Sequence, residues 1–363
     1  MRPFYRLICA GLVALLASAP GRGQPAECSP DAELTYLCGL QKPEDLLAVP
    51  GTSWLVVSGF AKGAGLKLVD ARTRSYRQWY TGEESQLAPD AEAFSDCPGP
   101  PDPALFNTRG LSLRPLAAGH FRLLVVNHGG RESIEAFDVT LEQGKEPNLL
   151  WRGCVVMPAG QIGNSVAQFA DGTMLVTVLT RPGTTIGDFM LGRKTGAVWQ
   201  RGPADHQFRL LPGTELPGNN GIEADPDQRR FYVVAFGWHA VVVFDRKDTR
   251  RPLARISAPD FMPDNIHWTG GHLLLAGMRL DEPACGGLRK VVKGEADPML
   301  CKRGWIVGEL DTGTGRIATF AYGTPRQQFN GLSAAALVGR ELWLGSFQSE
   351  RLGIAGGPEA RDK

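Results

Sequence analysis

The chain has 363 residues, of which 39 are Lys or Arg and 38 are Asp or Glu, so its formal net charge at pH 7 is +1. A balance this close to zero, with no basic run, argues against nucleic acid and anionic membrane surfaces as partners. The length exceeds what one hydrophobic core usually fills, which indicates either several domains or one repetitive architecture.

The N-terminal segment has the pattern of a secretory signal peptide. Arg2 and Arg6 precede an apolar run over residues 7–16, and small residues follow at 17–19. We therefore predict a signal peptide over residues 1–24 and a periplasmic or secreted protein. The apolar run is too short to span a bilayer, and no later segment approaches the roughly 20 apolar residues that a spanning helix needs.

From about residue 46 onward, short β-branched and aromatic runs are bounded by Gly, Pro, Asn and Asp, and helical periodicity is nearly absent. This pattern predicts an almost all-β protein. The runs that we expect to be strands are 54–59, 65–70, 121–127, 134–139, 174–179, 231–236, 240–245, 273–278, 305–310 and 341–347.

Two long segments lack the strand pattern. Residues 86–106 are rich in Pro and acidic residues, and residues 280–302 contain two cysteines. Loops of this length are usually either functional lids or tethered excursions from the fold, and both interpretations are open for these two segments.

Six times along the chain, a polar or Gly-containing step followed by an apolar residue opens a group of strands. The spacing of these openings, 44 to 66 residues, suits four-stranded blades with variable loops. We predict a six-bladed β-propeller around a central tunnel, formed by residues 25–363 as one domain, with a strand at 33–37 beside 341–347 closing the ring. The openings are Glu44-Asp45-Leu46, Arg109-Gly110-Leu111, Asn164-Ser165-Val166, Asn220-Gly221-Ile222, Asp264-Asn265-Ile266 and Asn330-Gly331-Leu332.

The cysteines indicate a disulfide framework. Cys9 lies in the predicted signal peptide, which leaves an even number for an oxidising compartment. No CxxC pair and no His at zinc-finger spacing occurs, so we do not expect a thiolate metal site. Six cysteines permit fifteen pairings, of which we favour Cys28 with Cys38, Cys97 with Cys154, and Cys285 with Cys301.

The blade openings also supply a set of oxygen donors. In a propeller the innermost strands line the channel, so residues at their entries converge on one spot. Two carboxylates and three amides suit a hard cation with relaxed geometry, which favours calcium over magnesium. A single Asn or Asp beside Gly is more often a turn former, but five at corresponding positions favour a metal site. The candidate ligands are Glu44, Asn164, Asn220, Asp264 and Asn265.

These segments resemble the paraoxonase (arylesterase) family, in the superfamily of SMP-30/gluconolactonase-like six-bladed propellers. The resemblance implies that the five oxygen donors bind a catalytic calcium, and that the chain hydrolyses a lactone or ester. The matching segments are 43–46 (Pro-Glu-Asp-Leu), 106–112 (Phe-Asn-Thr-Arg-Gly-Leu-Ser), 123–128 (Leu-Leu-Val-Val-Asn-His), 163–166 (Gly-Asn-Ser-Val), 220–222 (Asn-Gly-Ile), 264–266 (Asp-Asn-Ile) and 344–347 (Leu-Gly-Ser-Phe).

The chain departs from the family at the residues that activate water. Arg109 stands where the family has His, whereas His128 matches the second His of the family's proposed dyad. Arginine stays protonated and is no general base, but its planar fork can hold a carboxylate or phosphate, so we expect an anionic group on the substrate. His128 is then the candidate base, although a His that ends a strand more often packs or faces solvent. His239 is a candidate for the pocket wall.

The resemblance also implies a second, buried calcium, held in part by two further acids. Asp45 matches the first of these acids, but Ser165 replaces the second, so the sequence leaves the second ion open.

Two other functions compete with hydrolysis. A non-catalytic propeller would bind a ligand or protein on its calcium face. A propeller lyase or synthase similar to strictosidine synthase would use a Glu and no metal, which fits the clustered Asp and Asn poorly. Neither the identity of the substrate nor the oligomeric state follows from the sequence.

Overall fold

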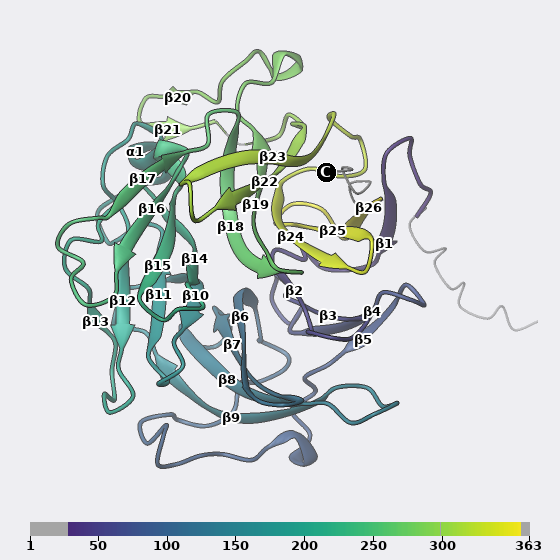
Figure 1. Ribbon diagram of the computed structural model, residues 1–363, viewed down its shortest axis with the longest axis vertical. Helices are drawn as coiled ribbons and strands as arrows, with labels where there is room; N and C mark the ends of the chain where they lie inside the picture. The colour runs from purple at the N-terminus through teal and green to yellow at the C-terminus, as the bar shows by residue number, and fades with distance from the viewer. Residues whose placement is uncertain (1–27, 298, 357–363) are drawn as a thin grey trace, which may run out of the picture.

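The computed structural model describes residues 28–297 and 299–356, so the predicted signal peptide lies outside the described residues. Six four-stranded antiparallel sheets surround a central channel as the blades of a propeller (Figure 1). The predicted six-bladed, all-β architecture is confirmed. Helix within the described residues is limited to α1 (Ile186–Met190) and the short turns η1 (Glu84–Gln86), η2 (Phe236–Trp238) and η3 (Pro283–Cys285).

Five of the sheets are built from strands in sequence order. The first contains β2 (Leu46–Ala48), β3 (Trp54–Val57), β4 (Lys67–Asp70) and β5 (Ser75–Gln78). The second contains β6 (Thr108–Ala117), β7 (His120–Asn127), β8 (Ser133–Thr140) and β9 (Asn148–Val156). The third contains β10 (Gly163–Gln168), β11 (Met174–Val178), β12 (Ala197–Arg201) and β13 (Arg209–Leu210). The fourth contains β14 (Asn219–Ala224), β15 (Arg230–Ala235), β16 (Ala240–Asp245) and β17 (Ala254–Ser257). The fifth contains β18 (Phe261–Thr269), β19 (His272–Arg279), β22 (Trp305–Asp311) and β23 (Arg316–Gly323).

The sixth sheet joins the two ends of the chain. Its order is β1-β26-β25-β24, with β1 (Thr35–Cys38), β24 (Leu332–Val338), β25 (Glu341–Ser346) and β26 (Arg351–Gly356). The N-terminal strand therefore closes the ring in the predicted blade, but its neighbour is β26 and not β25, so that part of the prediction was wrong. The glycines of β26 weaken its strand pattern in the sequence, because glycine is depleted in strands.

Apolar side chains fill the spaces between neighbouring sheets. Between the first two sheets, for example, Leu47, Trp79, Phe106, Leu123 and Phe137 belong to one buried cluster. Burying a side chain such as Leu or Phe contributes about 1.5–3 kcal/mol, so contacts of this kind hold the six sheets in a closed ring.

The favoured disulfide pairing is confirmed. Cys28–Cys38, Cys97–Cys154 and Cys285–Cys301 are bonded, with Cα atoms 5.8, 5.1 and 5.7 Å apart. Bonds of this kind persist in oxidising compartments. Within the described residues, no helix is both long and apolar enough to cross a membrane.

The first long loop, 86–106, runs along the outer edge of β9. The backbone N–H groups of Ala88 and Asp90 donate to the carbonyls of Trp151 and Arg152, at 3.0 and 2.7 Å. The Cys97–Cys154 bond fixes the loop to the same strand. The loop is therefore a tethered excursion that covers a strand edge, a position where unpaired backbone groups would otherwise be exposed.

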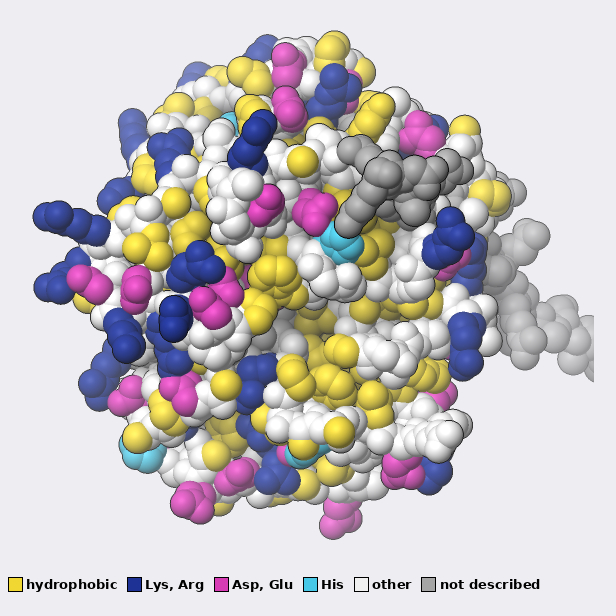
Figure 2. Space-filling view, in the orientation of Figure 1, with side chains coloured by type: hydrophobic (Ala, Val, Ile, Leu, Met, Phe, Trp, Pro, Cys, Tyr) yellow, Lys and Arg dark blue, Asp and Glu magenta, His cyan; other side chains and the backbone are white. Residues whose placement is uncertain are grey.

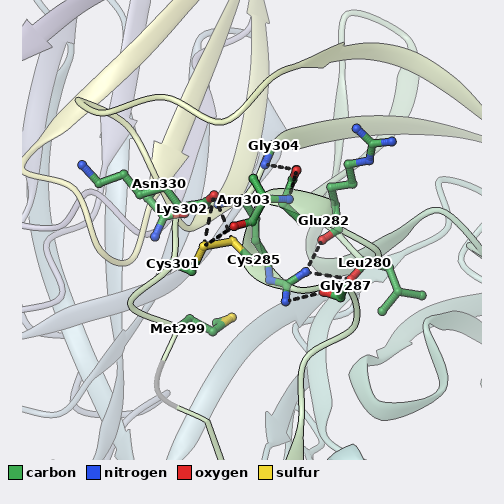
Figure 3. The surroundings of a disulfide bond; sticks show 12 residues. Leu280, Glu282, Cys285, Gly287, Met299, Cys301, Lys302, Arg303, Gly304 and Asn330 are labelled. Atoms are coloured by element: carbon green, nitrogen blue, oxygen red, sulfur yellow. Dashed lines mark hydrogen bonds between the residues drawn. A yellow bond between two sulfur atoms is a disulfide. The ribbon is translucent and has the colours of Figure 1, made fainter.

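The second long loop, 280–302, contains η3 and the hairpin of β20 (Val291–Val292) and β21 (Glu295–Ala296). Figure 3 shows the buried Arg303 beside its disulfide; the guanidinium donates to the carbonyls of Leu280 and Gly287 at 2.8 and 3.0 Å. The hairpin lies against α1 so closely that a Cβ at Gly187 would be 1.9 Å from the carbonyl oxygen of Gly294. This loop starts at the end of β19. That end of β19 pairs with residues 261–263 of β18, directly before the predicted ligands Asp264 and Asn265, so the loop leaves the tunnel at the same end as these ligands.

Candidate metal centre

Four of the five predicted ligands lie at breaks in the innermost strands, and Glu44 lies just before β2. The pairing of β10 with β11 shifts between Gly163 and Val166, and the corresponding pairs of β14 and β18 shift at Asn219/Ile222 and Pro263/Ile266. β6 shifts in the same way around Arg109, between Thr108 and Leu111. A bulge of this kind releases residues from the ladder and re-aims their side chains. The register shifts therefore fall on three dipeptides, whose side chains are free of the regular strand pairing: Asn164-Ser165, Asn220-Gly221 and Asp264-Asn265.

Close backbone approach explains the glycine at two of these openings. A Cβ at Gly110 would lie 2.5 Å from the Cα of Ser165, and a Cβ at Gly221 would lie 2.6 Å from the carbonyl oxygen of Asp264. Only glycine lets the neighbouring inner strands come this close. The glycines thus bring successive openings together around the tunnel.

The five candidate ligands are buried and in mutual contact, with exposed fractions of 5% or less. Asn164 Nδ2 donates to Asn220 Oδ1 at 2.6 Å, and Asn220 in turn hydrogen-bonds Asp264. Asn265 Nδ2 donates to Glu44 Oε1 at 3.1 Å. Four different sheets or their entries therefore supply side chains to a single cluster.

Four oxygen atoms of this cluster are buried and have no hydrogen-bond partner. They are Glu44 Oε2, Asn164 Oδ1, Asp264 Oδ1 and Asn265 Oδ1. A buried polar atom without a partner costs roughly 1–3 kcal/mol, so four in one place need a common explanation. A hard cation would satisfy all four at once, and oxygen-only donors of this kind suit calcium. The residues present therefore fit a calcium ion.

The electrostatics of the cluster favour the same conclusion. Burial raises the pKa of both the Glu44 and the Asp264 carboxyl groups above their usual range, and the charge of Arg109 opposes this rise. A divalent cation would keep both carboxylates ionised. Among the described residues, no group of three or more His, Cys, Asp and Glu side chains is arranged to bind a metal. The present cluster is not such a group, because only two of its five side chains are carboxylates and the other three are amides.

Arg109 lies beside the cluster and not within it. Its Nε is 3.7 Å from Glu44 Oε1, and its side chain is 18% exposed. The guanidinium also packs over the ring of Phe60, 4.5 Å from the ring centroid. Arg109 therefore brings a fixed positive charge to the rim of the metal centre.

His128 packs against the same phenyl ring. The imidazole meets the Phe60 ring at 65° with the centroids 5.9 Å apart. His128 Nδ1 lies 2.8 Å from Glu132 Oε2, while Nε2 is buried without a partner. A carboxylate on one ring nitrogen fixes the orientation and tautomer of a histidine. The roles of Phe60 and Glu132 were not predicted from the sequence. The one signal for Glu132 is that it follows His128 by four residues, a spacing that allows the two side chains to pair.

His239 has no hydrogen bond to the five candidate ligands within the part of the chain that the structure describes. It follows η2 in a left-handed backbone conformation, with φ of 48°, and burial lowers the pKa of its imidazole. Its assignment to the pocket wall stays a prediction.

An apolar cluster does lie at this end of the tunnel. Phe189, Phe236, Met262 and Met278 pack together in it, and Phe189 and Phe236 meet edge to face at 5.6 Å. Met262 precedes Asp264 by two residues on β18, which places the cluster next to the metal centre. Flanking it are the partly buried Leu179, Met190, Leu280, Met299 and Phe347.

Hydrogen bonds within the chain occupy Asp45, the acid that matches the expected second calcium site. Asp45 is fully buried; its Oδ2 accepts from the Leu111 N–H at 2.8 Å, and its Oδ1 lies 2.9 Å from His267 Nε2. Nδ1 of the same imidazole faces Glu223 Oε2 at 3.3 Å. Burial lowers the pKa of His267, but the charges and hydrogen bonds of Asp45 and Glu223 together outweigh burial and raise the pKa to about 10. With Ser165 in place of the second acid, these residues do not fit a second calcium.

Comparison with known proteins supports the fold and assigns no activity. No family model matches the chain, and no curated protein matches it. Among solved structures, a calcium-binding protein, regucalcin, from Agrobacterium tumefaciens superposes with a TM-score of 0.50 and 12% identity, over 90% of this chain and 94% of that one. A luciferin-regenerating enzyme superposes with a TM-score of 0.49 and 13% identity, over 88% and 93% of the two chains. The chain thus has the fold of the regucalcin structure.

Proposed function

We propose that this chain is an exported, calcium-dependent hydrolase of a lactone or ester, similar to the paraoxonases. The observation that carries the proposal is the set of four buried, unpartnered oxygens on Glu44, Asn164, Asp264 and Asn265. Asn220 completes the ligand set, because it bridges two of these residues. Three disulfides support an oxidising compartment, in keeping with the predicted signal peptide.

The chain's own residues divide the remaining work. When bound, calcium would polarise the substrate carbonyl and stabilise the negative charge that develops on its oxygen. His128 is the candidate base, because Glu132 holds Nδ1 and leaves Nε2 free to accept a proton from water. Arg109 offers a guanidinium to an anionic group of the substrate, since Phe60 holds it in place.

The surroundings favour a substrate with an apolar part. The partly buried Leu179, Met190 and Leu280, which flank the buried cluster of Phe189, Phe236, Met262 and Met278, can pack against a hydrocarbon chain or ring. Methionine adapts to differently shaped ligands, because its side chain is flexible and polarisable. A lactone or ester with an apolar acyl part and an anionic group would use both the apolar cluster and Arg109.

A non-catalytic calcium-binding propeller is the second candidate. It is favoured by Arg109, which stands where the related family has a proton-accepting His and which cannot accept a proton at working pH. Calcium would then hold a ligand or protein on this face of the propeller without turnover.

Metal analysis combined with hydrolysis assays separates the two candidates. We expect bound calcium and turnover of at least one member of a panel of lactones and aryl esters, with the activity lost on chelation and regained with calcium. The variant Asn220→Ala should lose both calcium and activity, whereas His128→Gln should lose activity and keep calcium. Full metal content without any chelator-sensitive turnover would instead support the binding protein.

A further inference from the structure

A charged cavity lies between the second and third sheets, away from the metal centre. Arg114 follows Arg109 by five residues on β6, which places it about 17 Å along the strand at ~3.4 Å per residue. The cavity measures about 300 Å³. Its polar and aromatic lining includes Phe94, Arg114, Arg122, Gln168, Asp171 and Arg201.

The positive charges of this cavity exceed the negative charges available to neutralise them. Arg122 is paired with Asp138, whose Oδ1 lies 2.8 Å from Arg122 Nε. The one carboxylate in the lining, Asp171, is bound by Arg246 from outside the cavity. Among the described residues, the other two guanidinium groups of the lining, those of Arg114 and Arg201, have no carboxylate in ion-pair contact.

Arg201 is the more deeply buried of these two, with an exposed fraction of 6%. Its Nη2 donates to the carbonyl of Ala93 at 2.7 Å, and its Nε is buried without a partner. Arg114 Nη1 donates to the carbonyl of the next residue, Pro115, at 3.0 Å, and its Nε is also buried without a partner. Neither side chain has a carboxylate within 4.0 Å among the described residues.

Burying a guanidinium group, even in part, with no carboxylate in ion-pair contact is unfavourable. Burial lowers the pKa of both guanidinium groups here, and the charges of Asp171 and Asp205 only partly oppose this for Arg114 and Arg201. Phe94 lies between Arg122 and Arg201, with its ring centroid 5.9 and 5.8 Å from the two Cζ atoms, so aromatic contact holds part of the lining in place. On the face drawn in Figure 2, Lys and Arg side chains gather over the sheet β6-β7-β8-β9 beside the central hollow.

We propose that this cavity is an anion site that binds phosphate, either as the free ion or as the phosphate group of a small molecule. Guanidinium groups match the oxygens of phosphate with parallel N–H donors, and such charge-assisted bonds are short and strong. The anion would supply the counter-charge that Arg114 and Arg201 lack. This inference stands apart from the proposed hydrolase site, because it uses neither its ligands nor its metal.

Calorimetric titration of the full chain with inorganic phosphate, and separately with phenyl phosphate, tests the proposal. We expect a Kd at or below about 1 mM for at least one of the two. The variant Arg114→Gln should weaken binding at least tenfold. It should fold, because among the described residues the Arg114 side chain donates a hydrogen bond only to the adjacent carbonyl of Pro115. Arg201→Gln should weaken binding as much, with circular dichroism to confirm folding. The exposed Arg250→Gln serves as the matched control and should bind as the unmodified chain does.

The variant Asn220→Ala separates this cavity from phosphate bound at calcium. Binding that survives Asn220→Ala and falls in Arg114→Gln supports the arginine site. Binding that is lost in Asn220→Ala and unchanged in Arg114→Gln would overturn it, as would the absence of binding by both probes. Tighter binding of phenyl phosphate than of the free ion would identify a small-molecule phosphate as the occupant, and the reverse order would identify the free ion.

Discussion

Arg109 should weaken calcium binding while it strengthens the binding of anionic substrates, and the variant Arg109→Met tests both effects at once. Methionine keeps an unbranched apolar stem for contact with Phe60 but removes the charge beside Glu44. The variant is therefore expected to bind calcium more tightly and to discriminate less in favour of anionic substrates.

The magnitude follows from the distance of 3.7 Å between Arg109 Nε and Glu44 Oε1. Two unit charges at this separation interact by about 4 kcal/mol at an effective dielectric constant of ~20 and by about 1 kcal/mol in bulk water. Because the Arg109 side chain is 18% exposed, water screens part of its effect on a cation held by Glu44. We take about 1.4 kcal/mol as the lower end of the expected gain, which corresponds to tenfold tighter calcium binding.

Isothermal titration of calcium into the two proteins measures this gain, with Arg72→Met as a control, since the Arg72 side chain is 75% exposed and far along the first sheet from the cluster. Parallel assays with an anionic and a neutral ester should show kcat/KM falling for the anionic ester alone. Calcium affinity in Arg109→Met equal to or below that of the unmodified chain would contradict the expected repulsion between Arg109 and calcium, because the guanidinium would then not face the cation.

Three further predictions follow from the contacts described above. Glu132→Gln should lower turnover by about tenfold, because His128 loses the carboxylate that orients it, while calcium affinity stays the same; unchanged turnover would argue against this role. Replacing both Cys97 and Cys154 by Ser should lower the free energy of unfolding, measured by urea denaturation, by about 4 kcal/mol. This magnitude comes from the loop-closure entropy of a crosslink over a sequence separation of 57 residues. A change near zero would show that other contacts hold the loop 86–106. Elemental analysis at saturating calcium should give one ion per chain, because Asp45 is already hydrogen-bonded; two ions would contradict that interpretation.

The fold could be predicted because each of its six sheets begins with a recognisable local sequence step, a polar or Gly-containing pair followed by an apolar residue. Each predicted opening lies at or near the start of an innermost strand, and four of them coincide with bulges, since steps such as Asn220-Gly221 both break a ladder and allow a close neighbour. The partner of β1 could not be predicted from the same signals. Gly353 and Gly356 interrupt β26, so the strand that lies next to the N-terminus has little β pattern of its own.

The candidate site could be predicted only as far as residues at equivalent blade positions converge. Glu44 and Asp264 are 220 residues apart, yet their corresponding places at strand entries suffice to predict that they meet. Contacts from loops have no such rule. Phe60 and Glu132 reach Arg109 and His128 from turns whose geometry depends on the packing of neighbouring sheets. For the same reason, nothing in the sequence indicated the arginine cavity.

The proposal that five side chains hold one calcium ion is tested most directly by a crystal structure of this protein, from crystals grown in the presence of calcium. We expect a single strong density peak within about 2.3–2.6 Å of oxygen atoms from Glu44, Asn164, Asn220, Asp264 and Asn265, the distances typical of calcium. The same five side chains bonded only to one another and to water, at saturating calcium, would contradict it.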